Sequence, residues 1–338
     1  MKTNNFNLLQ YLALTGATFA GSSPELGQIT VANSTQNYAG SLAQDVQGYL
    51  AGLPSSDEMT RLEALVPGMQ TNDFFQFAKA DDEAYLTEAD DSDIRAVGAS
   101  FKRVQYKGTT VTDSTQQKGL TMRVDHKTLP KVNGVIVAGW ENRYANTLRN
   151  RLIRADIVRA IALIDASSTN VAVTFSSGTN PDGLLRAQCQ LSRVAIGDLA
   201  NVQIVIGNAS WQGRVDAYEA AARVNIGAAN HSDYTPEDLA RYLGVKRVLI
   251  EDGLKQTAKG AAKTDRLGLA NYSYSVTDSP LMDDPSSIKR AWSPVTGGGE
   301  WAVAVQESAV YTDITVWHES KMFVPFSSGI RKTTVTVA

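Results

Sequence analysis

Residues 301–338 read WAVAVQESAVYTDITVWHESKMFVPFSSGIRKTTVTVA, and this stretch decides the fold because it holds two strand signals and no catalytic motif. Each signal is a set of β-branched residues at a period of two. The first set is Val310, Thr312, Ile314 and Val316, and the second is Thr333, Val335 and Val337. We expect the C-terminus to be paired in a sheet. Together with a central helix that is distant in sequence, these strands predict a platform built from separate segments of the chain. Such a platform suits the assembly of subunits better than catalysis.

That helix spans Asn142–Asp165, where apolar and polar stripes lie on largely opposite sides. The apolar stripe is Tyr144, Leu148, Leu152 and Ala155. The second half, IVRAIALID, is apolar nearly all round, which predicts that it is buried. Five arginines stand at 143, 149, 151, 154 and 159. Salt bridges to an acidic loop are the favoured interpretation of these arginines, and contact with nucleic acid is the alternative.

The first 70 residues are rich in Gly, Ser, Asn, Gln and Pro and lack sustained periodicity, which is typical of an extended arm. Lys2 precedes an apolar run, as in a signal peptide, but Asn4, Asn5, Asn7 and Gln10 interrupt it. We therefore expect an uncleaved arm. An acidic run follows at 81–93, and it lacks the turn glycine and distal glutamate of an EF-hand calcium loop.

Residues 100–129 alternate on both sides of the polar string DSTQQKG, which predicts a long two-stranded hairpin. An isolated hairpin of two strands is marginally stable in water. We therefore expect this one to lie against another surface, such as a neighbouring subunit.

Residues 171–306 have the pattern of a compact α/β unit. Asn180 and Pro181 open a helix through Leu191, and Thr235 caps a second helix that Gly244 ends. Further elements are a strand at 202–206, a helix at 210–223 and a strand at 245–250. The pattern predicts one small mixed layer with two strands.

The composition sets broad limits on function. The chain has 338 residues, 43% hydrophobic and 20% charged, with a net charge of −3, which describes a soluble globular protein and disfavours a general nucleic-acid binder. No stretch reaches the roughly 20 apolar residues of a membrane-spanning helix. The single Cys189 excludes an internal disulfide and reads as a small core residue.

No catalytic, cofactor or metal motif is recognisable. The string GAAKTD at 260–265 misses the phosphate-loop spacing, and Ser177 and Ser328 lack a nucleophile elbow. His126, His231 and His318 are widely spaced and have no partner at motif spacing, so His318 is interpreted as structural. We therefore expect no enzyme, no cofactor and no metal ion.

The order of these parts resembles the major capsid proteins of tailed double-stranded-DNA bacteriophages, with the Hong Kong 97-type fold of class α+β. Similar strings are YKGTTVTDSTQQKGLTMRVD, NRYANTLRNRLIRADIVRAI, TPEDLARYLGVKRVLIEDG and VWHESKMFVPFSSGIRK. The resemblance covers about 81–338. It implies an N-terminal arm at 1–80, an acidic segment with an extended loop at 81–131, and a peripheral domain with a spine helix at 132–170. An axial domain at 171–306 and C-terminal strands of the peripheral domain at 307–338 complete the chain.

The implied function is self-assembly into pentamers and hexamers of an icosahedral shell around packaged DNA, in a virion assembled in the host cytoplasm. Contact with the DNA is expected to be weak and non-specific, and portal, scaffolding or decoration proteins are further partners. Two sets of residues are candidates for contact between subunits: the basic Lys102, Arg103, Lys107, Lys118 and Arg123, and the acidic Asp82, Glu83, Asp90 and Asp91. Arg143, Arg149 and Arg154 are candidates to face the shell interior.

Three other functions fit the same observations. An encapsulin-like nanocompartment shares the fold but encloses cargo enzymes. A soluble α/β enzyme with its site beside 171–306, and another phage part such as a tail tube, are less favoured. Covalent cross-linking through Lys107 or Lys118 has no local motif that fixes its partner.

Overall fold

The computed structural model describes residues 46, 57–79, 97, 109–129, 131–132, 135–136, 139–196, 201–222, 229–256, 258–282, 284, 286–295 and 298–338. The chain divides into two compact units. Unit 1 takes its described residues from 1–56, 117–153 and 294–319, and unit 2 takes them from 57–116, 154–293 and 320–338. Helix α5 (Trp140–Ala166) and strand β15 (Tyr311–Phe323) contribute residues to both units.

Unit 1 is a helix packed on long antiparallel strands. β15 pairs with β14 (Trp301–Glu307) and with β4 (Gln116–Asp125). Side chains of α5 and of the strands form one core. Its buried members include Ala145, Leu148, Leu152, Val303, Ile314 and Val316. The alternation expected for this strand is confirmed for Thr312, Ile314 and Val316, which are all buried. It is wrong for Val310, which precedes β15 and is 64% exposed. Two short strands, β5 (Lys131–Val132) and β6 (Val135–Ile136), pair antiparallel.

Helix α5 confirms the long helix expected at 142–165, with two extra residues at its start and one at its end. The expectation that its second half is buried all round is wrong. Ile157, Ala160 and Ile164 are buried at helical spacing, whereas Val158 is 38% exposed and Arg159 is exposed. A helix packed on one side buries one stripe at helical spacing and leaves the residues on its other side exposed.

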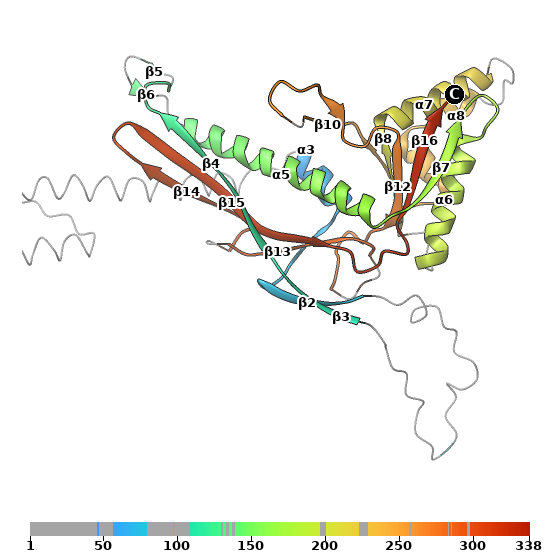
Figure 1. Cartoon of the computed structure of the whole chain (residues 1–338), viewed down its shortest axis with the longest axis horizontal. Coiled ribbons are helices and arrows are strands. Elements are labelled where there is room, and N and C mark those ends of the chain that lie inside the picture. Colours follow the sequence, from blue (N-terminus) through green and yellow to red (C-terminus); the bar gives the residue numbers. More distant parts are fainter. Residues whose placement is uncertain are drawn as a thin grey trace, which may run out of the picture. The chain divides into compact units, whose positions relative to one another are not determined.

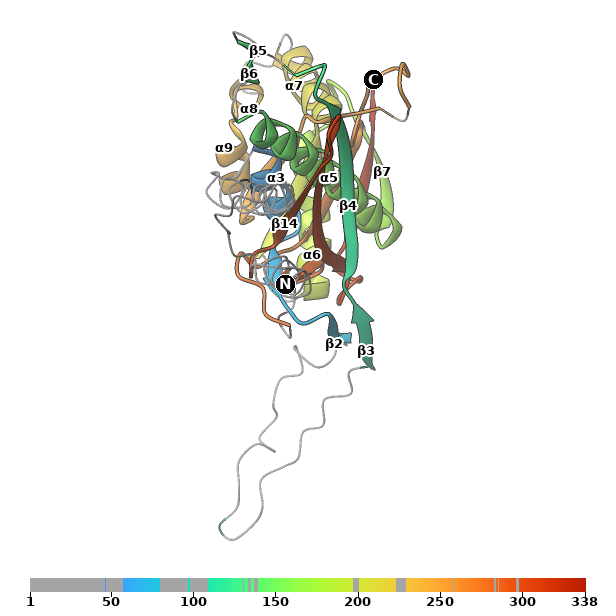
Figure 2. The same cartoon turned by 90° about the vertical axis from the view of Figure 1, so that its left-hand side faces the viewer.

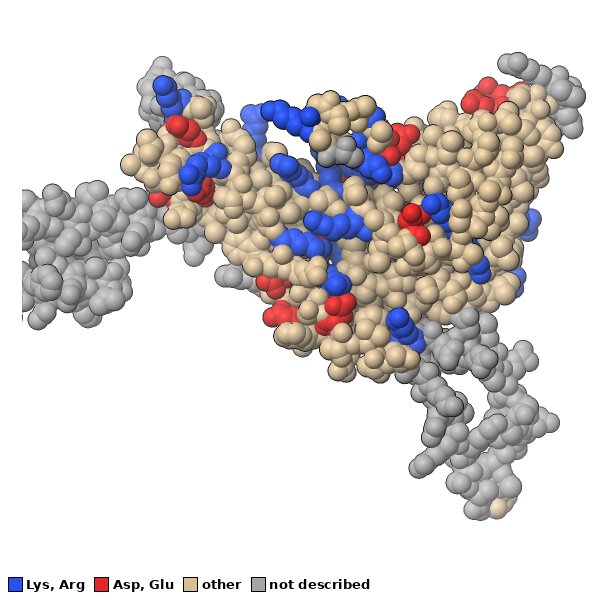
Figure 3. Space-filling view, viewed as in Figure 1, with Lys and Arg blue, Asp and Glu red and all other residues tan. Residues whose placement is uncertain are grey.

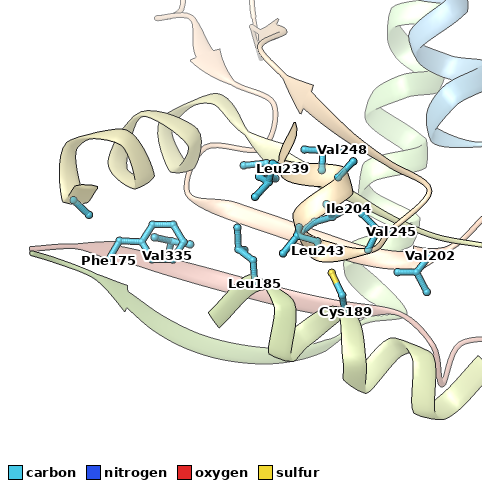
Figure 4. Close-up of a cluster of buried hydrophobic side chains, with 13 residues drawn as sticks. Phe175, Leu185, Cys189, Val202, Ile204, Leu239, Leu243, Val245, Val248 and Val335 are labelled. Atoms are coloured by element: carbon cyan, nitrogen blue, oxygen red, sulfur yellow. The ribbon is translucent and has the colours of Figure 1, made fainter. Parts of the chain in front are cut away.

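Unit 2 is built on a five-stranded sheet in the order β7-β16-β12-β8-β9 (Figure 1). Its strands are β7 (Thr169–Phe175), β16 (Arg331–Val337), β12 (Ala270–Ser275), β8 (Val202–Gly207) and β9 (Arg247–Glu251). The helices packed on one face are α6 (Pro181–Ile196), α7 (Asn208–Ala222) and α9 (Pro236–Leu243), and α8 (Ala229–Ser232) follows α7. Figure 4 shows the core between them, where Leu185 and Cys189 of α6 meet Ile204 of the sheet.

The opposite face of this sheet is covered by α3 (Asp57–Leu65) and by the end of α5. Tyr274 donates its hydroxyl to the carbonyl of Leu65 at 3.0 Å, and Gln203 donates to the carbonyl of Ala64 at 3.1 Å. Tyr272 donates to Asp165 of α5 at 2.8 Å. The sheet therefore has helices on both sides.

The C-terminal strand lies elsewhere than expected. Residues 307–338 were expected to complete the peripheral domain together, but β16 pairs with β7 and β12 in the sheet of unit 2. The expected layer of two strands at 171–306 therefore has five strands, and β14 within that range belongs to unit 1. The reason is that β16 is β-branched on both faces, so it fits the centre of a covered sheet, which the local pattern does not distinguish from an edge.

Part of the expected N-terminal arm is folded. Residues 57–65 form α3, in which Met59, Leu62 and Leu65 are buried at intervals of three. β1 (Gly68–Gln70) pairs in parallel with β13 (Lys289–Ser293). A helix of nine residues is too short to give sustained periodicity, so its burial depends on a tertiary partner. Of residues 1–56, only Val46 is described.

The hairpin expected within 100–129 is wrong. β3 (Thr109–Ser114) and β4 follow each other with only Thr115 between them, and they pair with different strands. β3 pairs antiparallel with β2 (Phe74–Lys79), from Phe74 with Ser114 to Lys79 with Thr109 (Figure 2). The polar string DSTQQKG lacks the Asn-Gly or Asp-Gly pair that favours a reversal, so the chain continues as strand.

The expected ends of α9 are confirmed, whereas α6, which was expected to run through Leu191, continues to Ile196. Thr235 accepts from the backbone of Asp238 in a capping box, and Gly244 ends α9 with φ +73°. Glycine adopts that left-handed conformation without steric cost. Among the described residues, no helix is long and apolar enough to cross a membrane.

Candidate functional site

The paired strands β2 and β3 form the base of the connection 80–108. The register places Lys79 opposite Thr109, so the chain leaves the sheet after Lys79 and returns at Thr109. The pairing extends by one bond, from the amide of Thr115 to the carbonyl of Asp73 at 2.9 Å. We call β2 and β3 the loop base.

Three phenylalanine rings attach the loop base to the body of unit 2. Phe75 and Phe77 project from one face of β2 and are buried. Their ring centroids lie 5.2 and 4.4 Å from that of Phe323 at the end of β15. Buried aromatic clusters of this kind contribute area burial and ring–ring contact. Phe74, on the other face of β2, is 76% exposed.

Polar contacts also hold β2 and β3 near the end of the loop base that is opposite the 80–108 connection. Asp73 accepts a hydrogen bond from the Ser293 hydroxyl of β13. Lys321 of β15 lies 3.6 Å from Asp113 of β3. The loop base is thus tied by β13 and β15, both far away in sequence, which the local pattern of residues 74–79 did not reveal.

Most of the expected contact residues lie outside the described residues. These are Lys102, Arg103, Lys107, Asp82, Glu83, Asp90 and Asp91. All seven lie in the 80–108 connection, whose ends are the loop base. Lys118 and Arg123 lie instead on β4.

Arg123 has a partner within its own chain. Its guanidinium forms a two-bond fork with the carboxylate of Asp313 on β15, at 2.9 and 2.8 Å, and lies 3.9 Å from the centre of the Tyr311 ring. The Arg123 hydrogen bonds hold the pKa of Asp313 below its ordinary value. Lys118 is half-buried on the same strand. Arg123 is therefore engaged in strand pairing within unit 1, a role that sequence reasoning missed.

The three arginines expected to face a shell interior differ in exposure. Arg143 is exposed, whereas Arg149 is buried with its guanidinium 5.6 Å from the Trp301 ring. Burial lowers the pKa of Arg149. Arg154 is exposed and donates to Glu58 of α3 at 3.0 Å. Figure 3 shows lysine and arginine side chains gathered over the part of this face where α5 lies in Figure 1.

Helix α3 is held by ion pairs as well as by its apolar side. Glu58 accepts from Arg154 and Arg266, Glu63 pairs with Arg290, and Arg61 pairs with Asp252. Burial raises the pKa of Glu58, but hydrogen bonds from Arg266 and Arg154 outweigh it, so the pKa lies below its ordinary value. Helix α3, which precedes the loop base in the sequence, is thereby fixed to the rest of unit 2.

A buried charge cluster joins α6, α7 and α8. Asp182 at the start of α6 binds Arg214 of α7 through two bonds, of 2.5 and 3.0 Å, and both side chains are fully buried. His231 lies 3.0 Å from the same carboxylate and stacks on Tyr218. Sequence reasoning gave His231 no partner, because Asp182 is 49 residues away. The Tyr218 hydroxyl donates to Asn180, so the cluster orders three helices.

The groups that bear on the expected chemistry of the described residues are metal ligands, the Cys189 thiol and the His318 ring. Among them, no group of three or more His, Cys, Asp and Glu side chains could hold a metal ion. Burial raises the pKa of the Cys189 thiol to about 12, which makes a poor nucleophile and confirms it as a core residue. His318 is fully buried and its ring stacks on Trp301 with centroids 4.3 Å apart.

Neither the protein-family models nor the curated proteins contain a match to this chain. Among solved structures, the chain is similar to a phage-related protein from Bordetella bronchiseptica RB50, with a TM-score of 0.64 and 14% identity over 87% of this chain and 98% of that one. Weaker matches are Gordonia phage Cozz (TM-score 0.48, 10% identity, 82% and 86% covered) and the capsid of cyanophage P-SCSP1u (0.47, 8%, 80% and 86%). The Bordetella likeness shows a shared fold over nearly the whole of that chain.

Proposed function

Because this chain has the Hong Kong 97-type fold, we propose that it is a shell protein that assembles into the pentamers and hexamers of an icosahedral phage capsid. The observation that carries the proposal is the loop base. Unit 2 uses three buried phenylalanines and a bond from Ser293 to hold two strands whose connection is 80–108. Rigid strands at both ends of so long a connection are expected when the connection has to be presented to a binding partner.

The proposed partners follow from the same role. The main partner is another copy of this chain, and stable interfaces of the obligate kind bury roughly 2,000 Å² or more. The enclosed material is double-stranded DNA, held by weak non-specific contact, since the net charge of the chain is −3. Portal, scaffolding or decoration proteins complete the proposed virion, which assembles in the host cytoplasm.

We propose no catalytic role for this chain. The buried thiol of Cys189 and the buried Asp182–Arg214 pair support this, because each has a packing role. A soluble enzyme is the competing proposal.

Size-exclusion chromatography with light scattering, followed by negative-stain electron microscopy, tests the proposal on the purified full chain. The expected result is capsomers or closed shells at micromolar concentration. A chain that remains a compact monomer or dimer at every concentration and salt condition would overturn it. Closed particles that carry host protein and no DNA when isolated from the producing cell would favour the encapsulin-like alternative.

A further inference from the structure

A small exposed hairpin projects from unit 2. It consists of β10 (Leu254–Lys255) and β11 (Thr264–Asp265), which pair antiparallel, with the turn between them (Figure 1). Most of its described residues are exposed, and Leu254 is 53% exposed. Two strands without a covered face are marginally stable in water. The hairpin therefore needs either a rigid attachment or a partner.

The attachment is rigid. Arg266, directly after β11, is buried and pairs with Glu251 at 3.1 Å and with Glu58 of α3 at 3.2 Å. Its amide donates to the carbonyl of Gly253 at 2.9 Å. A Cβ atom on Gly253 would lie 2.3 Å from the Glu251 carboxylate, so a larger residue before β10 would displace the side chains of the buried Glu251–Arg266 pair. The direction of the hairpin is thus set by a buried ion pair.

The turn of the hairpin is ordered by its own bonds. Gln256 donates its side-chain amide to the carbonyl of Ala261 at 2.6 Å, and the amide of Ala261 donates to Ala258 at 3.1 Å. Gly260 has φ +83°, which only glycine adopts without strain. The turn has a defined shape before any partner binds, which lowers the entropic cost of binding.

The hairpin carries concentrated positive charge. Lys255, Lys259 and Lys263 are exposed, and none of them forms an ion pair with an acidic residue that the structure describes. Figure 3 shows lysine and arginine side chains at the free end of the hairpin. Asp265 at its foot is the one acidic residue between 254 and 265. Close like charges repel each other, so a negatively charged partner stabilises this arrangement.

The chain contains a segment of matching charge. Residues 81–93 hold seven acidic side chains and no lysine or arginine. This segment follows β2, and Figure 1 shows the loop base at the opposite end of unit 2 from the β10–β11 hairpin. The hairpin of one copy therefore suits the acidic segment of another copy better than that of its own.

We propose that the β10–β11 hairpin is a docking element that binds the acidic segment 81–93 of a neighbouring copy of this chain. The inference rests on the proposed shell function and names a contact within it. DNA is a weaker candidate for the hairpin, because three lysines neutralise few phosphates and the remainder of the chain is net negative.

A binding experiment tests the contact directly. A fluorescein-labelled peptide of residues 80–94 is titrated with the unassembled full chain, and anisotropy is measured. We expect binding that weakens at least tenfold in the triple variant Lys255→Glu, Lys259→Glu, Lys263→Glu, and that weakens with added salt. The triple Lys→Arg variant is the matched control and should bind within twofold of wild type. Equal peptide binding by wild type and the Lys→Glu variant overturns the proposal.

An assembly experiment places the contact between copies. The Lys→Glu triple should raise the protein concentration needed for assembly at least tenfold. Adding Asp82→Lys, Asp90→Lys and Asp91→Lys to the Lys→Glu triple should restore assembly. The control reverses the charges of Lys127, Arg186 and Arg193 in the wild-type chain and should leave assembly unchanged.

If wild type assembles and the Lys→Glu triple assembles equally well, the docking contact is wrong and the shell function stands. If wild type never assembles, the shell function itself is wrong. A triple that loses binding to a double-stranded DNA oligonucleotide and assembles normally also overturns the docking contact.

Discussion

At the scale of single residues, charged side chains fall into two groups. Some are buried in ion pairs that stabilise the fold, and others are exposed and available to a binding partner. Asp182, Arg214 and Arg266 are buried with partners, whereas Lys259 and Lys263 are exposed. The buried pairs bring together residues that lie 32 and 15 positions apart in the chain. Removing one member of such a pair leaves an uncompensated charge in a low-dielectric interior, which is strongly destabilising.

Asp182→Ala is the sharpest test of this view. The change leaves Arg214 buried without its carboxylate, so the free energy of unfolding should fall by about 3–5 kcal/mol. Urea denaturation of the unassembled chain, followed by circular dichroism, measures it. Arg241→Ala is the control, because the Arg241–Asp238 pair is exposed and should cost at most about 1 kcal/mol. Similar losses in the two variants would contradict a structural role for the cluster.

A second residue-scale prediction concerns pH. The Lys332 ammonium, 2.6 Å from Asp165, lowers the pKa of that carboxyl; partial burial opposes this and the Tyr272 hydroxyl adds to it. Because the folded pKa lies below the ordinary 3.8, the stabilisation is present above about pH 3.8 and disappears as the pH falls through the folded pKa. Asp165→Asn should remove this part of the acid dependence, within about 1 kcal/mol because the pair is partly exposed. Urea midpoints between pH 2 and 6 measure it, and an unchanged slope in the variant would refute the assignment.

At the scale of elements, local signals gave the helices but not the partners of the strands. The ends of α9 and the start of α6 follow from Thr235, Gly244 and Pro181, whose effects act within one turn. β3 and β2 were not assigned to each other, because they are separated by 80–108 and strand pairing leaves no mark on the sequence of either strand. Seven of the nine contact candidates lie in the 80–108 connection and stay a prediction, whereas the hairpin was expected around the wrong turn.

Phe77→Ala tests whether the aromatic cluster holds the loop base. Phe77 is 5% exposed and its ring lies 4.4 Å from that of Phe323, so the variant should lose about 3–5 kcal/mol of stability. Hydrogen exchange should rise in β2 and β3 first. Phe74→Ala, at 76% exposure, is the control and should stay within about 0.5 kcal/mol of wild type. Unchanged exchange in β2 and β3 of the Phe77 variant would show that the cluster does not anchor them.

At the scale of the whole molecule, we expect folding and the proposed assembly to be separable. The loop base closes a register in which Lys79 faces Thr109, so a two-residue Asn-Gly turn can replace 80–108 without altering either strand. We expect the shortened chain to keep its circular dichroism spectrum and cooperative unfolding, and to form no shells at concentrations where wild type does. Electron microscopy and light scattering measure this. Shells of normal size from the shortened chain would show that 80–108 has no part in assembly.

The sequence by itself determined the long helix, the caps of α6 and α9, the buried alternation of Thr312, Ile314 and Val316, and the resemblance that predicted the fold. These depend on backbone preferences and on periodic burial, which neighbours within a few residues set. Only the tertiary structure decided that β16 joins β7 and β12, that Arg123 binds Asp313 190 residues away, and that Phe323 anchors the loop base. Those contacts are chosen by competition among all exposed edges and charges of the folded chain, which no local stretch of sequence encodes.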